Sequence, residues 1–239
     1  MGKRIAYFSG CAANYVDPDI GKATIQVLER NGLQPILPEQ VCCGIPQWRQ
    51  GNFAAALKKA RANLATLAKI DCEVVTSCTT CALALKHYYP LFLESPETNA
   101  LAQRTYETSE YLAKLRNNGA LDTKFNSISM SLLYHAPCHL KALGQELIGS
   151  RLKLMNLIPG ISVTRIDRGC CGMAGTFGAK RNTQPLTTKI VQGLFQGIKE
   201  AKVDRVATDC PTCKLQIEQG TGFSVIHPIQ VFQKAYGLL

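Results

Sequence analysis

The chain repeats one cysteine pattern twice, and this repetition constrains the fold more than any other feature of the sequence. Each copy has a single cysteine, then two adjacent cysteines followed by glycine, then a C-x-x-C pair. The single and double cysteines are 31 positions apart in the first copy and 32 in the second, and the double cysteine precedes the pair by 35 and 39 positions. The first copy comprises Cys11, Cys42, Cys43, Cys78 and Cys81, and the second comprises Cys138, Cys170, Cys171, Cys210 and Cys213. Such an internal duplication predicts two similar structural units.

The segments around the cysteines repeat as well, and they predict strands that alternate with helices. A short apolar strand ends at Cys11 in "RIAYFSGC" and at Cys138 in "SLLYHAPC". In both halves a helix, a second strand, the double cysteine, another helix and a third strand ending at the C-x-x-C pair follow. A last helix, in "TYETSEYLAKL" or "HPIQVFQKAYG", closes each half.

The first of these helices carries both start and stop signals. Asp17 is a candidate N-cap, Pro18 suits the first turn, and Gly32 fits the end of the helix. Between them runs one apolar stripe at helical spacing, formed by Ile20, Ala23, Thr24, Val27 and Leu28. The stripe predicts that one face of this helix is buried.

Strands that alternate with helices are typical of parallel sheets covered by helices. We therefore expect an α/β fold of two pseudo-symmetric repeats, each a small parallel sheet flanked by helices. The repeats are predicted at residues 1–120 and 125–239, with a polar connection at 116–127. Because sites in such sheets form beyond the carboxyl ends of the strands, we expect the five thiols of each half to surround one crevice.

Cysteine usage and charge restrict what the chain can bind. Eleven cysteines are an odd number and the N-terminus has no apolar signal segment, so we expect a cytoplasmic protein with metal or redox chemistry rather than disulfides. Cys72, which lies outside both copies, is expected to be a packing residue. The net charge is +10, but the basic residues are scattered, so we expect no nucleic-acid binding. A basic face suits an acidic partner protein, an anionic membrane surface or simply solvent.

Five thiols in each copy exceed what one zinc ion needs. Structural zinc takes four ligands in a tetrahedron, and an ordinary four-iron cube is held by four cysteines. Two neighbouring thiolates do not easily bind the same tetrahedral ion, whereas they can reach two irons of a cluster, so the double cysteine favours iron–sulfur. The glycine after each double cysteine, Gly44 or Gly172, would let the backbone approach a bulky inorganic core. Either one thiol is spare or the cluster is unusual, and a zinc-stabilised interaction module is an alternative.

The twofold pattern resembles the cysteine-rich "CCG" domains of the heterodisulfide reductase B subunits and their relatives. The resemblance extends over nearly the whole chain, from "FSGCAANY" to "VIHPIQVF". Segments such as "YHAPCHLKALG" and "CCGMAGTFGAKR" are most similar to those of anaerobic glycerol-3-phosphate dehydrogenase C subunits. The resemblance implies one iron–sulfur cluster for each five-cysteine copy, so that all ten cysteines are ligands of two 4Fe-4S clusters. In the heterodisulfide reductase branch these clusters are noncubane.

The resemblance implies a function in electron transfer. The sequence has no G-x-G-x-x-G after its first strand, so we expect no flavin or nicotinamide bound by the chain itself. We expect an iron–sulfur subunit of a multi-subunit oxidoreductase that relays electrons from a flavin-containing dehydrogenase to an acceptor such as quinone. Glycerol-3-phosphate dehydrogenase is the best match for that dehydrogenase. Such a protein would be cytoplasmic or peripheral at the inner face of the membrane. The alternative is a heterodisulfide reductase-type catalytic subunit that cleaves a disulfide at a noncubane cluster.

Other residues carry weaker expectations. The C-x2-C-x2-C-x3-C-P segment of glycerol-3-phosphate dehydrogenase C subunits is absent from this sequence, so either a ferredoxin-like subunit is a further partner or the chain belongs to a different branch of the family. His135 and His139, which flank Cys138, either bond a cluster sulfur or relay protons, or are polar residues of a tight loop. Trp48 either shields the first cluster from water or is a core residue. Asp209 would lower the potential of the second cluster if it is close and ionised.

Overall fold

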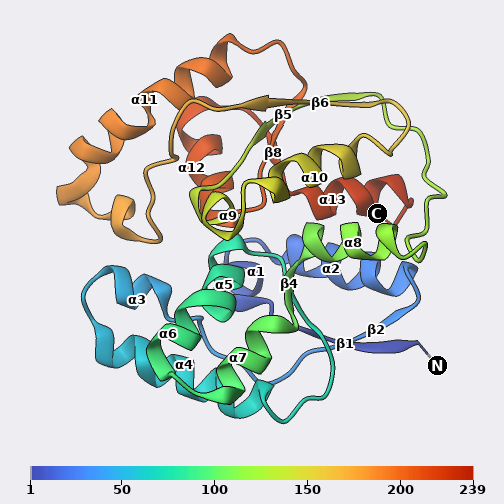
Figure 1. The fold of residues 1–239 in the computed structure, drawn as a ribbon. Helices are drawn as coiled ribbons and strands as arrows, with labels where there is room; N and C mark the ends of the chain where they lie inside the picture. Colours follow the sequence, from blue (N-terminus) through green and yellow to red (C-terminus); the bar gives the residue numbers. More distant parts are fainter. Residues whose placement is uncertain (1, 239) are drawn as a thin grey trace.

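Each half of the chain forms one four-stranded parallel sheet in the computed structural model, which describes residues 2–238 (Figure 1). The strand order is β2-β1-β3-β4 in the first half and β6-β5-β7-β8 in the second, so the two sheets share one topology. The first sheet contains β1 (Lys3–Tyr7), β2 (Leu33–Ile36), β3 (Val74–Thr76) and β4 (Thr105–Glu107). The second contains β5 (Met130–His135), β6 (Ile161–Ile166), β7 (Arg205–Ala207) and β8 (Val225–Ile226). The expected fold class is confirmed.

Helices cover both sheets and connect their strands. The first half contains α1 (Gly10–Tyr15), α2 (Pro18–Arg30), α3 (Ile45–Arg49), α4 (Phe53–Leu67), α5 (Thr79–Leu83), a π-helical turn (Ala84–Tyr88), α6 (Tyr89–Leu93), α7 (Pro96–Gln103) and α8 (Thr108–Asn117). The second half contains α9 (Cys138–Leu143), α10 (Glu146–Met155), two 3-10 turns (Phe177–Ala179 and Arg181–Thr183), α11 (Gln184–Glu200), α12 (Pro211–Thr221) and α13 (Pro228–Ala235). Residues 118–129 connect the halves without helix or strand, close to the expected polar connection.

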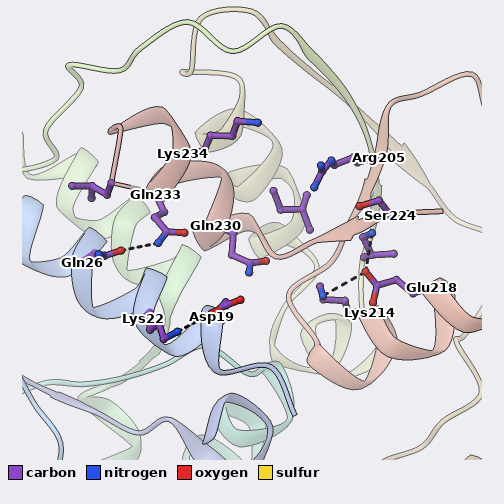
Figure 2. A pocket seen from close by; sticks show the side chains of 13 residues that line it. Asp19, Lys22, Gln26, Arg205, Lys214, Glu218, Ser224, Gln230, Gln233 and Lys234 are labelled. Carbon is purple, nitrogen blue, oxygen red and sulfur yellow. Dashed lines mark hydrogen bonds and ion pairs between the residues drawn. The ribbon is translucent and has the colours of Figure 1, made fainter. Parts of the chain in front are cut away.

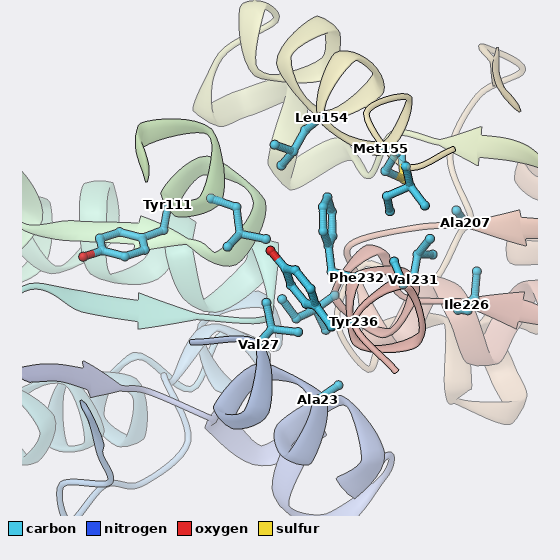
Figure 3. Packing of buried hydrophobic residues seen from close by; sticks show 14 of the residues in the cluster. Ala23, Val27, Tyr111, Leu154, Met155, Ala207, Ile226, Val231, Phe232 and Tyr236 are labelled. Atoms are coloured by element: carbon cyan, nitrogen blue, oxygen red, sulfur yellow. The ribbon is translucent and has the colours of Figure 1, made fainter. Parts of the chain in front are cut away.

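The two halves share one hydrophobic core at their junction. Helix α2 of the first half packs on α13 of the second, and α10 of the second half packs on α8 of the first. Side chains from both halves meet there, among them Val27, Tyr111, Leu154 and Phe232 (Figure 3). Because each contact pairs the second helix of one half with the last helix of the other, an approximate two-fold axis relates the halves. Burial of this apolar surface stabilises the junction.

Each half also has an outer core, and most of its cysteines belong to it. In the first half these are Cys43, Cys78 and Cys81, and in the second half they are Cys171, Cys210 and Cys213. The apolar faces of α4 and α11 close these outer cores, for example through Leu67 and Leu194. The thiols of both copies are therefore placed by the packing of the sheet against its helices.

Helix α2 follows its sequence signals closely, with one exception. All five residues of the expected apolar stripe are buried, and Pro18 opens the helix as expected. Asp17 occupies the N-cap position, but its side chain makes no capping hydrogen bond. Instead, its Oδ2 lies 2.8 Å from Nζ of Lys214 in α12. The expectation that Asp17 caps the helix is wrong, because an ion pair with the second half competes for its carboxylate.

The fourth strand of each sheet is not predicted by the sequence. "TYETSEYLAKL" reads as one helix, yet Thr105–Glu107 forms β4 beside β3, and the helix begins only at Thr108. The strand Val225–Ile226 is even shorter and pairs with β7. Two or three residues are too few to show the alternation by which strands are recognised, so tertiary pairing decides these segments.

Within residues 2–238, no helix combines the length and the apolar composition needed to cross a bilayer.

Candidate functional site

The five thiols of the first half are gathered beyond the carboxyl ends of the strands. Cys11 lies in the first turn of α1 after β1, Cys78 immediately precedes α5 after β3, and Cys81 lies within α5. Cys42 and Cys43 lie between β2 and α3. Neighbouring thiols shift one another's pKa: Cys11 lowers the pKa of Cys42, Cys42 raises that of Cys43, and Cys43 and Cys78 raise that of Cys81. The fold thus brings together all five cysteines of the first copy.

The second half repeats this arrangement. Cys138 begins α9 after β5, Cys210 immediately precedes α12 after β7, and Cys213 lies within α12. Here too neighbouring thiols shift one another's pKa: Cys138 lowers the pKa of Cys170, Cys170 raises that of Cys171, and Cys171 and Cys210 raise that of Cys213. The sulfurs of Cys171 and Cys213 are 3.0 Å apart. Cys138 is exposed, so this single cysteine forms the solvent side of the second site.

Glycines with left-handed backbone conformation lie next to the thiols of both sites. Gly10 has φ +66°, and a Cβ atom added to it would lie 2.8 Å from Sγ of Cys81. The glycines after the double cysteines, Gly44 and Gly172, have φ +89° and +78°, and a Cβ atom added to them would meet Ala56 of α4 or Thr187 of α11, so the approach of their backbone to a cluster stays a prediction. Any other residue would be strained in this left-handed conformation. The three glycines are therefore required by the geometry of the sites.

Two side chains from distant helices hold the first double cysteine, and the sequence alone identified neither of them. Asn63 of α4 accepts a hydrogen bond from the amide of Val41 at 2.8 Å and donates to the carbonyl of Cys42 at 3.3 Å. Tyr89 of α6 donates to the carbonyl of Cys43 at 3.2 Å and accepts from Asn63 at 2.9 Å. Neither residue belongs to a motif, so only their long-range contacts identify them.

Gln40, just before the double cysteine, ties this loop to α1. Its Oε1 accepts a hydrogen bond from the amide of Gly10 at 3.1 Å, and its Nε2 donates to the carbonyl of Tyr7 at 3.2 Å. The segments that carry the single and double cysteines are thus fixed to each other by hydrogen bonds.

One thiol in each double cysteine is strongly stabilised as a thiolate. A hydrogen bond from Cys11, followed by one from Cys43, lowers the pKa of Cys42 to about 2. Hydrogen bonds from Cys138 and Cys171 likewise lower the pKa of Cys170 to about 2. Because the thiolate is the form that binds metals, Cys42 and Cys170 are the ligands most readily available at neutral pH, whereas hydrogen bonding and burial raise the pKa of Cys43, Cys81, Cys171 and Cys213.

The two five-thiol sites are neighbours across the junction between the halves. Helix α5 packs on α9, and α1 packs on α12. Oγ1 of Thr80, inside the first C-x-x-C, lies 2.8 Å from Nδ1 of His139, the residue after Cys138. Gln50 donates to the hydroxyl of Thr176 at 2.7 Å, which joins the segments that follow the two double cysteines. The sites therefore form one thiol-rich region of the molecule.

A buried charged network lies beneath the second C-x-x-C. Arg151 of α10 forms ion pairs with Asp209, at 3.2 Å, and with Glu107 of the first half, and all three side chains are at most 1% exposed. Tyr134 donates a hydrogen bond to Asp209, and Ser109 donates to the same carboxylate at 2.9 Å. Burial, together with the nearby Asp209, raises the pKa of Glu107 to about 7 despite the opposing effect of Arg151. The network joins both halves through one guanidinium.

The equivalent position in the first half carries no charge. Ser77 precedes Cys78 as Asp209 precedes Cys210, and its hydroxyl lies 2.7 Å from that of Tyr7. The charged network therefore distinguishes the second site from the first. The effect of Asp209 on a cluster potential stays a prediction, and the ion pair with Arg151 now has to be included in it.

The remaining candidates have mostly structural surroundings. His135 is buried at the end of β5, and burial lowers its pKa to about 4, so it is neutral at pH 7. His139 lies in a helix rather than a tight loop, and its Nδ1 meets a hydroxyl rather than a sulfur. Trp48 is half-buried and stacks on Phe92 with ring centroids 3.9 Å apart. Cys72 is half-buried and packs against the first outer core, apart from the five-thiol site.

The donor atoms of the two sites suit an iron–sulfur cluster. In residues 2–238, no three His, Cys, Asp or Glu side chains are arranged around a position for a single metal ion. The clustered donors are all thiols, which as soft ligands select iron–sulfur clusters or zinc rather than hard cations. At Gly10 the backbone lies so close to the sulfur of Cys81 that only glycine leaves this thiol unobstructed. The residues present therefore fit such a cluster.

A cavity of about 640 Å³ lies between α2, α12, β8 and α13 (Figure 2). Charged and amide side chains line it, including Arg205, Lys214, Glu218 and Gln230. No cysteine belongs to this lining, so the cavity is separate from the thiol-rich region.

Comparisons with known proteins show which family the chain belongs to. The family model described as "Cysteine-rich domain" matches residues 5–86 and 132–218, so both copies match separately. The C subunit of anaerobic glycerol-3-phosphate dehydrogenase from Escherichia coli K12 is 34% identical over 237 residues, covering 97% of this chain and 59% of the relative. An uncharacterized iron-sulfur protein of Methanocaldococcus jannaschii is 32% identical, covering 90% of this chain and 41% of the relative. The chain spans about half the length of these two relatives.

The fold is also found among solved structures. A hypothetical protein from Helicobacter pylori superposes with a TM-score of 0.64 at 14% identity, covering 98% of this chain and 49% of that chain. At this identity the similarity extends to the fold alone.

Proposed function

Because the chain belongs to the cysteine-rich domain family, we propose that it is an iron–sulfur electron-transfer subunit of a multi-subunit oxidoreductase. The observation that carries this proposal is the duplicated group of five thiols gathered beyond the strand ends of each sheet. The names of the relatives support it, since one is a dehydrogenase subunit and the other an iron-sulfur protein.

Each half would hold one 4Fe-4S cluster with its own five cysteines. The first would be held by Cys11, Cys42, Cys43, Cys78 and Cys81, and the second by Cys138, Cys170, Cys171, Cys210 and Cys213. Five thiols favour a noncubane cluster over a cube with four ligands. A bound cluster supplies one-electron transfer, and its potential depends on charge, hydrogen bonds and solvent exposure.

The chain's own residues would position and shield these clusters. Asn63 and Tyr89 fix the first double cysteine from behind, so its two thiols keep their spacing. Cys43, Cys81, Cys171 and Cys213 are buried, which keeps water from the inner side of each site. Cys138 is exposed, so a partner could approach the second site from this side.

The partners are proposed from the relatives' names and the chemistry. A flavin-containing dehydrogenase subunit, best matched by that of the glycerol-3-phosphate enzyme, would deliver electrons. A ferredoxin-like subunit or quinone at the inner face of the membrane would accept them. The net charge of +10 suits an acidic partner or an anionic membrane surface.

Anoxic purification tests this proposal. We expect a brown protein whose visible absorption bleaches on reduction, with iron and sulfide but no stoichiometric zinc. A colourless zinc protein would instead establish the interaction-module alternative. A disulfide that is cleaved by the isolated, reduced chain would establish the heterodisulfide reductase-type activity rather than a pure relay.

A further inference from the structure

The hydrogen bond between Thr80 and His139 is a buried connection between the two five-thiol sites. Thr80 is the third residue of the first C-x-x-C, and His139 follows the single cysteine of the second copy. Their side-chain atoms Oγ1 and Nδ1 are 2.8 Å apart, and both residues are at most 9% exposed. The bond joins α5, which carries Cys81, to α9, which begins at Cys138.

This connection exists on one side of the approximate two-fold axis only. The residue equivalent to His139 is Ala12, which follows Cys11 and has no polar side chain. The residue equivalent to Thr80 is Thr212, and its hydroxyl lies 3.0 Å from Sγ of Cys210 within its own site. The Thr80–His139 pair is therefore not a consequence of the duplicated fold but a feature added to one of two equivalent contacts.

Two other side-chain contacts join the cysteine-bearing segments of the two halves, and both are less suited to fix the spacing of the sites, while the buried Arg151 network reaches the first half at Glu107 and Ser109 rather than at its thiols. The bond between Gln50 and Thr176 is solvent-exposed, so water can replace it. The ion pair between Asp17 and Lys214 leaves both side chains 17% exposed. In a buried environment a hydrogen bond is directional and costly to break, so the Thr80–His139 bond defines the geometry more strongly.

We propose that Thr80 and His139 are positioning residues that fix the two cysteine sites for electron exchange with each other. The pair holds α9 on α5 and so sets the position of Cys138 relative to Cys81. This inference rests on the proposed function, because electron exchange requires a cluster in each site.

The test compares Thr80→Val with Thr79→Val, a matched control in the same C-x-x-C. Thr79 is also buried, but its hydroxyl has no hydrogen-bond partner in the described part of the chain. Thr80→Ser keeps the hydroxyl and serves as the rescue variant. In anoxically purified samples with equal iron content, flash photoreduction measures electron equilibration between the clusters, and EPR measures their spin–spin interaction.

We expect Thr80→Val to slow equilibration by roughly fivefold, the factor that corresponds to one net hydrogen bond holding the docked geometry. The EPR lines that report the spin–spin interaction between the clusters should broaden in Thr80→Val, whereas the rates and EPR lines of Thr80→Ser and Thr79→Val should match those of the wild type. Equal rates and EPR line shapes in Thr80→Val and Thr79→Val would overturn the inference. A wild-type protein without iron would instead overturn the proposed function.

A second measurement does not depend on clusters. Urea unfolding of Thr80→Val, His139→Leu and the double variant forms a double-mutant cycle. If the two side chains act as a pair, the double variant loses less stability than the two single variants together. Additive losses would overturn the positioning role, including in the case where the variants bind too little iron for the kinetic comparison.

Discussion

Replacing Arg151 with methionine should destabilise the protein strongly, because Arg151 supplies the positive charge of the buried network that it forms with Glu107 and Asp209. Its guanidinium pairs with both carboxylates and also donates to the carbonyl of Leu147 at 3.0 Å. Methionine retains much of the aliphatic length of the side chain but leaves two buried carboxylates without this cation. Breaking a buried pair by removing one partner costs roughly 3–5 kcal/mol. We expect the free energy of unfolding to fall by about that amount at pH 8.

The loss of unfolding free energy in Arg151→Met should be smaller at lower pH. Without Arg151, the buried carboxylates can avoid their charge only by taking up protons, and more of them do so at pH 5 than at pH 8. The measurement is urea unfolding of both proteins at the two pH values. Lys153→Met is the matched control, since Lys153 is more exposed on the same helix, and its effect should stay within about 0.5 kcal/mol. A loss below about 1 kcal/mol at pH 8, or an equal loss at both pH values, would refute the assignment of a buried ionic network.

Three further changes test other parts of the structure. Burial raises the pKa of Glu107 from 4.5 to about 7, so between these pH values the folded chain retains a proton that the unfolded chain releases. The free energy of unfolding of the wild type should therefore fall as pH rises from about 4.5 to about 7. Glu107→Gln should flatten this pH dependence when it is measured by urea unfolding. Asn63→Ala removes the hydrogen bonds that hold the first double cysteine and should lower the free energy of unfolding by about 1–3 kcal/mol. Asn99→Ala, at an exposed position on α7, is the control, and an equal loss of stability in both variants would contradict the role of Asn63. Gly10→Ala should lower both stability and first-site iron more than Gly51→Ala, because both glycines have positive φ but only at Gly10 does the new Cβ meet a sulfur; equal effects would show that the close approach is not required.

The positions of the thiols could be predicted from the sequence because they are coupled to strand ends. In a parallel sheet all carboxyl ends meet at one edge, so cysteines that follow successive strands converge. The duplication doubled this signal, and even the left-handed conformation of Gly44 followed from its place after two cysteines. The apolar stripe of α2 was equally clear, since five residues at helical spacing specify one buried face.

The residues that hold the thiols could not be predicted, since their roles depend on contacts between distant segments. Asn63 is one polar residue in an amphipathic helix, and nothing in its neighbourhood shows that it reaches Cys42. Arg151 would be expected in solvent, as most arginines are, until Glu107 and Asp209 are seen to converge on it. Likewise, the pairing of Thr80 with His139 depends on how the two halves dock, which no local pattern encodes.

Site-resolved iron analysis tests the central claim most directly. Anoxically purified wild type, Cys43→Ser, Cys171→Ser and Cys72→Ser would be analysed for iron, sulfide and EPR signals. With one four-iron cluster in each site, we predict about eight irons per wild-type chain, an altered or lost signal from only the corresponding cluster in Cys43→Ser and Cys171→Ser, and no change in Cys72→Ser. If iron is absent from the wild type, or if Cys72→Ser has the same effect as Cys43→Ser, the two five-thiol sites are not the cluster sites.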